Sequence, residues 1–425
     1  MQKMLDTIRQ VFESFGFLPI STPAMELTEV LLTKTGGETE RQVYLAQSTG
    51  AHAQGQEPDL ALRFDLTVPL ARYVAEHEGE LSFPFRRYQI QPVWRGEAPQ
   101  RGRFREFIQC DIDVVDRDSL SIRYDAEMPA IISELFTQLA IGNFTIRLNN
   151  RRLLRGLLVE LGVDDADLQG HVLRELDKLD RDGAEAVARA LTGRGMAPAV
   201  VGRLLTMAGP GPLKGVAAAE MLRALPAAND SLRQGRDELL SVLSMIEMHG
   251  TPPDRIAVDL SIARGLDYYT GTVYETTLDG HEELGSICSG GRYDDLASLY
   301  SKSRLPGVGI SIGFTRLFDQ LRHLGLVGSA SNVQVLVTLI DDDGLSTSLA
   351  LASDLRRAGF NTEMIMTTGK LSRQLKYADR AGIPLVVIAG EDERQRGTLQ
   401  LRNLHTKTQV EIPSSDLAAT VGRIL

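Results

Sequence analysis

Hydrophobic positions follow a helical spacing in some parts of the chain and a strand-like spacing in others. The N-terminal residues place an apolar side chain every three or four positions, at Met4, Ile8, Val11, Phe12 and Phe15. This spacing predicts an amphipathic helix that ends near Gly16. Strand-like runs then dominate residues 60–148 and return from Ile256 to Tyr293, and Gly307–Gly313 precedes a further helix. The pattern therefore predicts a sheet assembled from two separate stretches of the chain.

The spacing is helical between the two strand-rich stretches and mixed at the C-terminus. Leucines at helical spacing, Ala-rich runs and Gly-Pro breakers predict a helical insertion over about residues 155–250, within a first domain of residues 1–325. A small, polar linker leads to a second domain of residues 332–425. There the run Val333–Ile340, a helix over Ser346–Arg357 and the run Leu385–Ile388 predict a small α/β domain with parallel strands.

One strand-like run carries polar residues in a regular alternation. Between Phe104 and Val115, the side chains of Phe107, Gln109, Asp111 and Asp113 recur at every second position. Alternate residues of a strand point to the same face. We therefore expect Gln109 and Asp113 to lie on one face of the sheet.

Composition and charge narrow the function classes. The 425 residues contain 46 Lys+Arg against 56 Asp+Glu, a net charge of −10, so nucleic-acid binding has to come from local basic patches. Two cysteines exclude a disulfide framework, and the seven histidines lack HxxxH and HExxH spacing, so we expect no protein metal site. No signal peptide and no run of about 18 apolar residues is found, so we expect a cytoplasmic protein without a membrane segment.

Two common phosphate-binding motifs can be excluded. The only Gly-Lys pair, Gly369-Lys370, is followed by Leu371 and lacks the upstream glycine of a P-loop. Gly307-x-Gly309 has its third glycine at Gly313, one position too late for the dinucleotide fingerprint. A nucleotide would therefore have to be held mainly by side chains.

Arginines suited to that task are dense in one segment, at positions 86, 87, 95, 101, 103 and 105. Guanidinium groups bind phosphates bidentately, and the neighbouring Phe104 and Phe107 could stack on a base. The alternative is a solvated charged hairpin with no ligand. Two other clusters, Arg264–Gly271 with its adjacent tyrosines and Cys288–Asp294 with its paired glycines, could line a pocket or form ordinary turns.

Together and in this order, the segments resemble the class II aminoacyl-tRNA synthetases, specifically the histidyl-tRNA synthetases, over nearly the whole chain. Thr22–Glu26 is similar to motif 1, Arg86–Asp113 to motif 2 and Gly307–Leu317 to motif 3. The runs Arg264–Tyr269 and Ser289–Tyr293 are similar to segments peculiar to the histidine enzymes. The resemblance implies an α/β protein with a mostly antiparallel catalytic sheet flanked by helices, and a homodimer formed through motif 1.

The resemblance also implies residues for the ATP site: Arg95, Glu97, Arg103, Phe107 and Arg316. Arg95 would hold the α-phosphate and the amino-acid carboxylate, and Arg264 would approach the same phosphate from the other side as a second catalytic cation. Arg316 would hold the γ-phosphate, and Phe107 would stack on adenine. Cations at these places suit the negative charge that builds up on the phosphate in the transition state. Mg²⁺ would arrive with ATP rather than in a protein cage.

The residues implied for L-histidine are Asp65, Thr67, Gln109, Asp113, Tyr268 and Tyr269. The ammonium group needs acceptors, which Asp65, Thr67 and Gln109 offer. The imidazole has one donor and one acceptor when neutral, and Asp113 with the two tyrosines meets that demand. The alternative for Asp65 is a helix N-cap, because it precedes Leu66-Thr67-Val68.

The C-terminal domain is similar to the anticodon-binding domain of the family. Its segment Lys370–Ala378 would direct Lys370, Arg373 and Lys376 toward the histidine tRNA, although the same spacing suits a solvated helix face. The activated histidine would pass to the 3′ end of that tRNA. Two departures from the family are expected to matter. Family members usually carry a short lead before the first helix, whereas this sequence starts almost at that helix, so the lead was either trimmed or is lacking in this lineage. Positions 65 and 113 hold aspartate where many bacterial relatives have glutamate.

Two other functions compete with the enzyme. A paralogue of the family serves as a non-catalytic, histidine-sensing regulatory subunit of an ATP phosphoribosyltransferase, typically without the C-terminal domain and with eroded ATP-site residues. Here that domain and Arg95, Arg264 and Arg316 are present. A generic RNA-binding α/β protein would have no use for the residues that match a free histidine.

Overall fold

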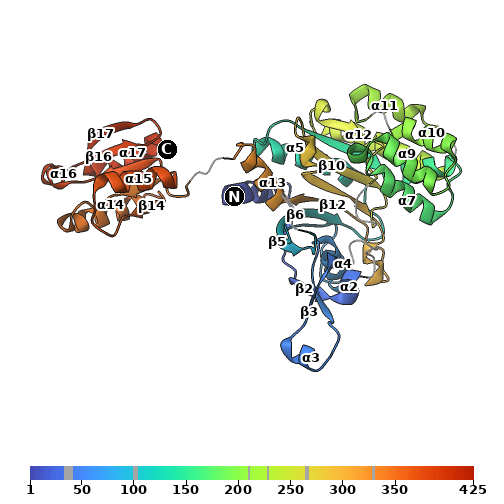
Figure 1. Cartoon of the computed structure of the whole chain (residues 1–425), viewed down its shortest axis with the longest axis horizontal. Coiled ribbons are helices and arrows are strands. Elements are labelled where there is room, and N and C mark those ends of the chain that lie inside the picture. The colour runs from blue at the N-terminus through green and yellow to red at the C-terminus, as the bar shows by residue number, and fades with distance from the viewer. Residues whose placement is uncertain (33–41, 99–103, 209–210, 227–228, 264–267, 328–330) are drawn as a thin grey trace. The chain divides into compact units, whose positions relative to one another are not determined.

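The computed structural model describes residues 1–32, 42–98, 104–208, 211–226, 229–263, 268–327 and 331–425. The chain divides into two compact units, Met1–Leu326 and Val327–Leu425 (Figure 1). Within the described ranges, no helix combines the length and the apolar character needed to cross a membrane.

The first unit is built on a large sheet whose described strands follow the order β1-β5-β6-β12-β11-β10-β7-β9-β8. The central strands pair antiparallel throughout: β5 (Phe85–Trp94), β6 (Glu106–Val115), β12 (Gly307–Gly313), β11 (Cys288–Tyr293), β10 (Thr272–Leu278) and β7 (Phe144–Asn150). Shorter strands complete the edges: β1 (Leu18–Pro19), β9 (Ile256–Val258) and β8 (Leu213–Lys214). The mostly antiparallel sheet expected from the sequence is confirmed, and it joins strands from both sides of the insertion.

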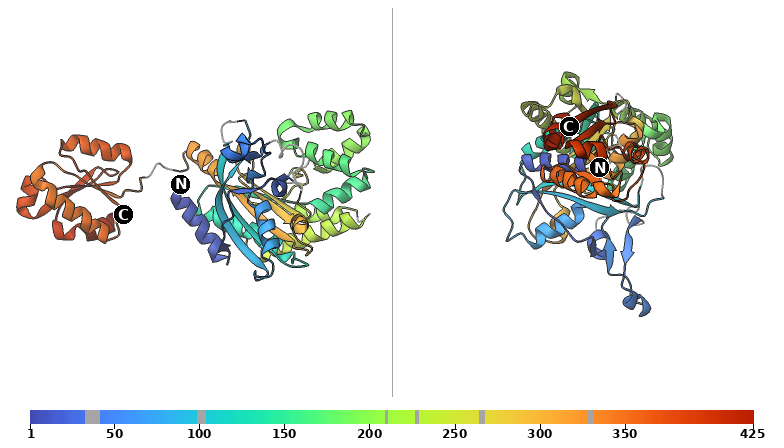
Figure 2. Two further views of the ribbon diagram at one scale, coloured as in Figure 1. Left: turned by 90° about the horizontal axis from the view of Figure 1, so that it is seen from below. Right: turned by 90° about the vertical axis from the view of Figure 1, so that its left-hand side faces the viewer.

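Helices bury one face of this sheet. They are α1 (Gln2–Ser14), α5 (Arg123–Gln138) and α13 (Phe314–His323), and α5 packs on β11 and β12. Figure 2 shows the N-terminal helix lying along one side of the sheet. The expected amphipathic helix is confirmed, because its buried positions Leu5, Ile8, Val11 and Phe12 are spaced by three, three and one residues. The opposite sheet face carries the polar residues and stays accessible near its centre.

The segment expected to be a helical insertion is helical. It contains α6 (Arg151–Glu160), α7 (Ala166–Leu176), α8 (Leu179–Asp182), α9 (Ala184–Gly193), α10 (Pro198–Ala208), α11 (Gly215–Ala224) and α12 (Asp230–Met248). Leucines of α6, α7, α9 and α10 form a hydrophobic core of their own, and Figure 1 shows these helices grouped beside β10. The helix α12 also packs on α6 and on α5, which ties the insertion to the main sheet.

A small three-stranded sheet precedes the main one, with β2 (Met25–Leu27), β4 (Leu60–Leu62) and β3 (Tyr44–Ala46) in that order. The helices α2 (Thr28–Leu32), α3 (Thr49–Ala53) and α4 (Thr67–Glu76) belong to the same region. The first turn of α4 follows directly on Asp65, which places this carboxylate at the junction between the small sheet and the main one.

The second unit is a sheet in the order β14-β13-β15-β16-β17 with helices around it. Its elements are β13 (Val335–Val337), α14 (Leu345–Arg357), β14 (Thr362–Met364), α15 (Leu371–Ala381), β15 (Leu385–Ile388), α16 (Glu391–Arg396), β16 (Thr398–Asn403), β17 (Thr408–Pro413) and α17 (Leu417–Ile424). The expectation of parallel strands holds for β14, β13 and β15, but β16 and β17 pair antiparallel. The physical reason is the short connection 404–407, which permits a hairpin but no crossover.

Candidate active site

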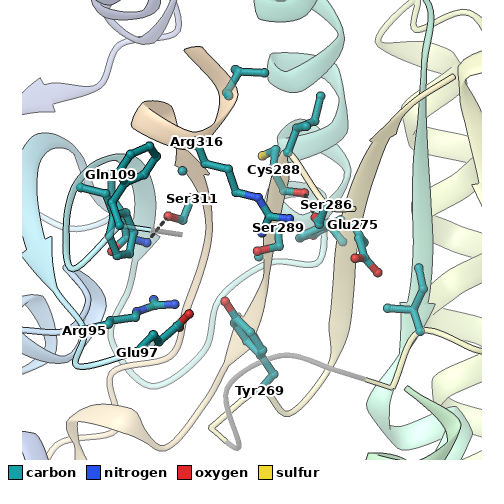
Figure 3. Close-up of a pocket in the computed structure, with 18 of the residues that line it drawn as sticks. Arg95, Glu97, Gln109, Tyr269, Glu275, Ser286, Cys288, Ser289, Ser311 and Arg316 are labelled. Atoms are coloured by element: carbon teal, nitrogen blue, oxygen red, sulfur yellow. Dashed lines mark hydrogen bonds between the residues drawn. The ribbon is translucent and has the colours of Figure 1, made fainter. Parts of the chain in front are cut away.

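A cleft of about 470 Å³ opens on the polar face of the main sheet (Figure 3). It is lined by Gln42, Arg95, Glu97, Phe104, Phe107, Gln109, Ile262, Tyr269, Tyr274, Glu275, Ser286, Ile287, Cys288, Ser289, Gly290, Ser311, Gly313, Arg316 and Leu317. Its volume lies within the range typical of small-molecule sites. Of the residues predicted from the sequence, the structure brings Arg95, Glu97, Phe107, Gln109, Tyr269 and Arg316 to this cleft.

The floor of the cleft follows from strand register. Asp111 of β6 stands opposite Ser311 of β12, Ser311 opposite Ser289 of β11, and Ser289 opposite Glu275 of β10. Partners in register share a sheet face, so this row places polar side chains from four strands side by side. Gln109, two residues before Asp111, donates from Nε2 to Ser311 Oγ at 2.7 Å.

Arg95 and Phe107 form one side of the cleft. Arg95 follows β5, and its Nε donates to the backbone oxygen of Phe64 at 3.1 Å. Its guanidinium carbon lies 5.2 Å from the centroid of the Phe107 ring, which is cation–π geometry. One face of that ring is therefore covered by a cation, and a stacked base would use the remaining aromatic surface.

Arg316 approaches the cleft from the first turn of α13. Its Nη2 donates to the backbone oxygen of Leu284 at 2.6 Å, and Gln320 Nε2 donates to the same oxygen at 3.1 Å. Figure 3 shows the Arg316 side chain extending from the helix toward Ser289. This anchoring fixes a second guanidinium across the cleft from Arg95.

A buried polar layer adjoins the cleft. Asp113 pairs with Arg87 Nη2 at 2.6 Å and accepts a hydrogen bond from Tyr293 Oη at 2.7 Å. The backbone of Gly309 makes room for this carboxylate, since a Cβ there would lie 2.1 Å from Asp113 Oδ1. Asp113 therefore lies on the same sheet face as Gln109, as expected, but its carboxylate is engaged by two protein groups and does not line the cleft.

Asp65 occupies two roles at once. Its Oδ1 accepts from the backbone N–H of Val68 at 3.1 Å, so the helix-capping alternative applies to one oxygen. Its Oδ2 is buried and has no hydrogen-bond partner among the residues that the structure describes. A buried carboxylate oxygen without a donor is a ready acceptor for a ligand N–H group.

Two tyrosines, Tyr268 and Tyr293, lie between Thr67 and Asp113. Tyr268 hydrogen-bonds to Thr67, and its ring contacts those of Tyr269 and Tyr293 at centroid distances of 4.9 and 6.0 Å. The predicted Asp65, Thr67, Asp113 and Tyr268 thus form a layer next to the cleft rather than part of its described lining. Arg103 and Arg264, predicted for the ATP site and for catalysis, lie outside the described residues.

Three buried aspartates of this polar layer, Asp65, Asp111 and Asp113, have raised pKa values. Burial raises the pKa of Asp65 to about 6, of Asp113 to about 6 and of Asp111 to about 7, because water no longer stabilises the charged form. The Arg87 cation opposes the shift in all three cases. The fully buried Arg87 is therefore a counter-charge that all three aspartates share.

We predict that Asp111→Asn stabilises the protein relative to wild type more strongly as the pH rises. The folded state keeps the Asp111 proton up to pH about 7, whereas the unfolded chain loses it near pH ~4. The contribution of Asp111 to the free energy of unfolding therefore falls across this interval and stays constant above it. The Tm difference between Asp111→Asn and wild type should grow from pH 5 to 7 and level off. A difference that does not change with pH would contradict the burial argument, and Asp59→Asn at an exposed carboxylate is the control variant.

Sequence reasoning missed the roles of two residues that organise this layer, Arg87 and Tyr293. Arg87 was counted among the phosphate-binding arginines, but it is fully buried and pairs with Asp113. Arg86 points to the other sheet face, where it binds Glu127 and the backbone oxygen of Phe15. The phosphate role is thus wrong for both. Strand alternation explains their opposite directions, and Tyr293, at the end of a recognised motif, could have been found as a partner for a buried carboxylate.

Comparisons with known proteins agree over the whole chain. A family model described as "Histidyl-tRNA synthetase" matches residues 1–317, and one described as "Anticodon binding domain" matches residues 334–424. The chain is 54% identical over 433 aligned positions to "Histidine--tRNA ligase" of Stenotrophomonas maltophilia (strain K279a), covering 99% of this chain and 93% of that protein. The "Histidine--tRNA ligase" of Xylella fastidiosa (strain M23) is 54% identical over 435 positions, with the same coverage.

Solved structures are also similar to the chain. The crystal structure of histidyl-tRNA synthetase from Nostoc sp. PCC 7120 matches with a TM-score of 0.86 at 40% sequence identity, covering 100% of this chain and 95% of that chain. A structure named as an ATP phosphoribosyltransferase regulatory subunit/histidyl-tRNA synthetase from Bacillus halodurans C matches with a TM-score of 0.70 at 18% identity, covering 88% and 91%. At that identity the likeness shows the fold alone.

Proposed function

The chain belongs to the histidyl-tRNA synthetase family, and on that premise we propose that the cleft binds ATP and L-histidine side by side. The protein is a histidine–tRNA ligase: it activates L-histidine with ATP to histidyl-adenylate and transfers histidine to the 3′ end of the histidine tRNA. The observation that carries the site assignment is the convergence of Arg95, Phe107 and Arg316 on one cleft. The buried Asp65 lies near Arg95, and its Oδ2 has no hydrogen-bond partner within the described part of the chain.

In the activation step, a carboxylate oxygen of histidine attacks the α-phosphorus of ATP, and the bond to the bridging oxygen of pyrophosphate breaks. Charge accumulates on the non-bridging oxygens, so a fixed guanidinium lowers the barrier by being in place before the reaction. We assign this role to Arg95, with Arg264 as the second cation, and we place the γ-phosphate at Arg316. Phe107 supports adenine, Glu97 and Arg103 complete the ATP contacts, and Mg²⁺ enters bound to the ATP phosphates.

Each polar group of the histidine substrate is matched by a complementary group of the protein. Its ammonium group donates to Asp65 Oδ2, with Thr67 and Gln109 as further acceptors. Its imidazole lies against Tyr269, with Asp113 and Tyr268 behind it. Such a polar site rejects an apolar amino acid by about 10⁴-fold, because the buried groups would lose their partners. In the second step, the 3′-hydroxyl of the terminal tRNA ribose attacks the carbonyl carbon, and AMP leaves.

The tRNA and a second copy of the chain are the proposed partners. Lys370, Arg373 and Lys376 are exposed at and along α15 of the unit that matches the anticodon-binding family, which suits a phosphate-rich ligand. Around motif 1, Leu18 is 65% and Met25 52% exposed, an apolar surface that supports a homodimer. The histidine–tRNA ligases of bacteria are its relatives, and we place the protein in the cytoplasm.

The intact protein is expected to catalyse exchange of labelled pyrophosphate into ATP only when L-histidine is present. Exchange reports adenylate formation without tRNA, so it tests the cleft by itself. Each of the other standard amino acids serves as a control for specificity. Histidine binding without any exchange would reject the enzyme and favour the histidine-sensing regulatory subunit, for which the likeness at 18% identity gives only the fold.

A further inference from the structure

A line of polar side chains connects the helical insertion with the segment that carries Tyr269. It runs through Glu238 of α12, Arg152 of α6, Asp294 after β11 and Thr270 before β10. Arg152 Nη1 pairs with Glu238 Oε1, and Arg152 Nη2 donates to Asp294 Oδ2 at 3.0 Å. Thr270 Oγ1 donates to the same Asp294 oxygen at 2.7 Å. Asp294 therefore links the helical insertion to the segment that carries Tyr269.

Asp294 is held in place from the sheet side as well. It is 7% exposed, and its Oδ1 lies 3.7 Å from Arg292 Nη1. Arg292 is itself fixed by Asp125, which accepts from its Nε and from its Nη2. Ion pairs with little exposure hold their geometry more strictly than solvated surface pairs. The carboxylate thus has a single well-defined position.

The insertion end of the line is equally constrained. The side chain of Asn150 caps α6 by accepting from the backbone N–H groups of Arg152 and Leu153. Its Nδ2 donates to Glu238 Oε2 at 2.9 Å. Glu238 is therefore oriented by two groups at the start of α6, and the position of Arg152 depends on how α6 and α12 pack.

The far end of the line fixes Tyr269. The backbone N–H of Thr270 donates to the Arg292 oxygen at 2.8 Å, and its hydroxyl binds Asp294. The Tyr269 ring rests on the backbone of Gly291, where a Cβ would lie only 2.8 Å from the ring. Figure 3 shows Tyr269 pointing into the cleft. Because the Tyr269 ring packs on Gly291, the hydrogen bonds of the adjacent Thr270 determine the position of the phenol group.

We propose that Asp294 is a positioning residue for histidine binding, which fixes Tyr269 through Thr270 and makes its placement depend on the insertion through Arg152. The inference rests on the proposed function, because Tyr269 contacts the histidine substrate there. The insertion then has a role in the activation step, separate from any contact with tRNA.

The test compares Thr270→Val, Asp294→Asn, Arg152→Met and Arg152→Lys in histidine-dependent pyrophosphate exchange. Thr270→Val removes only the hydroxyl, so the KM for histidine should rise about tenfold, as expected for loss of a hydrogen bond to a charged group. The KM for ATP should stay within about twofold. Arg152→Lys keeps one positive charge and should fall between Arg152→Met and wild type. The KM for histidine of the double variant Thr270→Val/Asp294→Asn should not exceed that of the more impaired single variant, because both substitutions break the same hydrogen bond.

The matched control is Arg233→Gln, which removes an ion pair with Asp230 on the exposed side of α12. Its KM for histidine should equal that of wild type. Variants with the same KM for histidine as Arg233→Gln would overturn the proposal. Parallel changes in both KM values together with a lowered Tm would also overturn it, since they indicate a merely structural role. If Asp294→Asn does not fold, Thr270→Val decides the question.

Failure of the proposed function gives a different result. If the wild-type protein shows no exchange, the enzyme assignment fails. The dissociation constant for histidine, measured by calorimetric titration, then replaces the KM for histidine. Weaker histidine binding in Thr270→Val than in Arg233→Gln would still support the positioning role. Equal binding would reject it.

Discussion

Replacement of Arg95 by methionine is expected to lower kcat for histidine-dependent pyrophosphate exchange about 10³-fold, the scale seen when a fixed cation or donor is removed from a transition state. Arg95 is anchored at Phe64 and rests on Phe107, so its guanidinium is already placed before ATP binds. Figure 3 shows it directed into the cleft. Exchange kinetics and the Tm of the variant measure the effect.

Two controls separate charge from geometry. Arg95→Lys keeps the charge but loses the planar fork, so its kcat should lie between those of wild type and Arg95→Met. Arg123→Met changes an exposed arginine at the start of α5, outside the cleft lining, and should leave kcat unchanged. A kcat of Arg95→Met within tenfold of wild type at unchanged Tm would remove Arg95 from the reaction.

The second large effect is expected at Asp65. Asp65→Asn keeps one oxygen, which can still accept from the backbone N–H of Val68. The second carboxylate oxygen, Oδ2, is replaced by an NH2 group, and the side chain loses its negative charge. The ammonium group of histidine then loses a buried charged partner, a loss of about 2–5 kcal/mol. The KM for histidine should rise about 10²-fold or more, whereas the KM for ATP should not change.

This variant also decides between the two roles of Asp65. If the residue were only a helix cap, Asp65→Asn would keep both the cap and the activity, and only Asp65→Ala would lose stability. Asp59→Asn, the same chemical change at an exposed carboxylate just before β4, serves as the control for histidine KM.

The local elements could be predicted from the sequence because their signals are local. The apolar spacing of α1, the buried run of β15 and the leucine repeats of α6 and α12 match the helices and strands of the structure. The antiparallel hairpin β16–β17 was missed because its outer strand is mostly exposed and its apolar alternation is short, with only Val410 and Ile412. An edge strand buries little, so the pattern of its side chains contains little information.

The arrangement of charges could not be predicted from residue spacing. Arg86 and Arg87 are neighbours in a segment rich in arginine, yet one packs on Phe17 and the other is buried beside Asp113. Which arginine reaches the cleft depends on strand direction and on partners from distant parts of the chain. Tyr293 binds Asp113 across 180 positions, and Thr315 binds the backbone of Ile108 across 207.

By itself, the sequence determined the family motifs, the helical insertion and the residue types that can hold a nucleotide and an amino acid. Only the tertiary structure decided that Arg95, Gln109, Tyr269 and Arg316 share one cleft, that Asp113 is bound by Arg87 and Tyr293, and that Asp294 links Arg152 of the insertion to Thr270. The physical reason is that residue chemistry and local periodicity are properties of a short stretch of chain. Ion pairing, desolvation and strand register are properties of segments that meet only after folding.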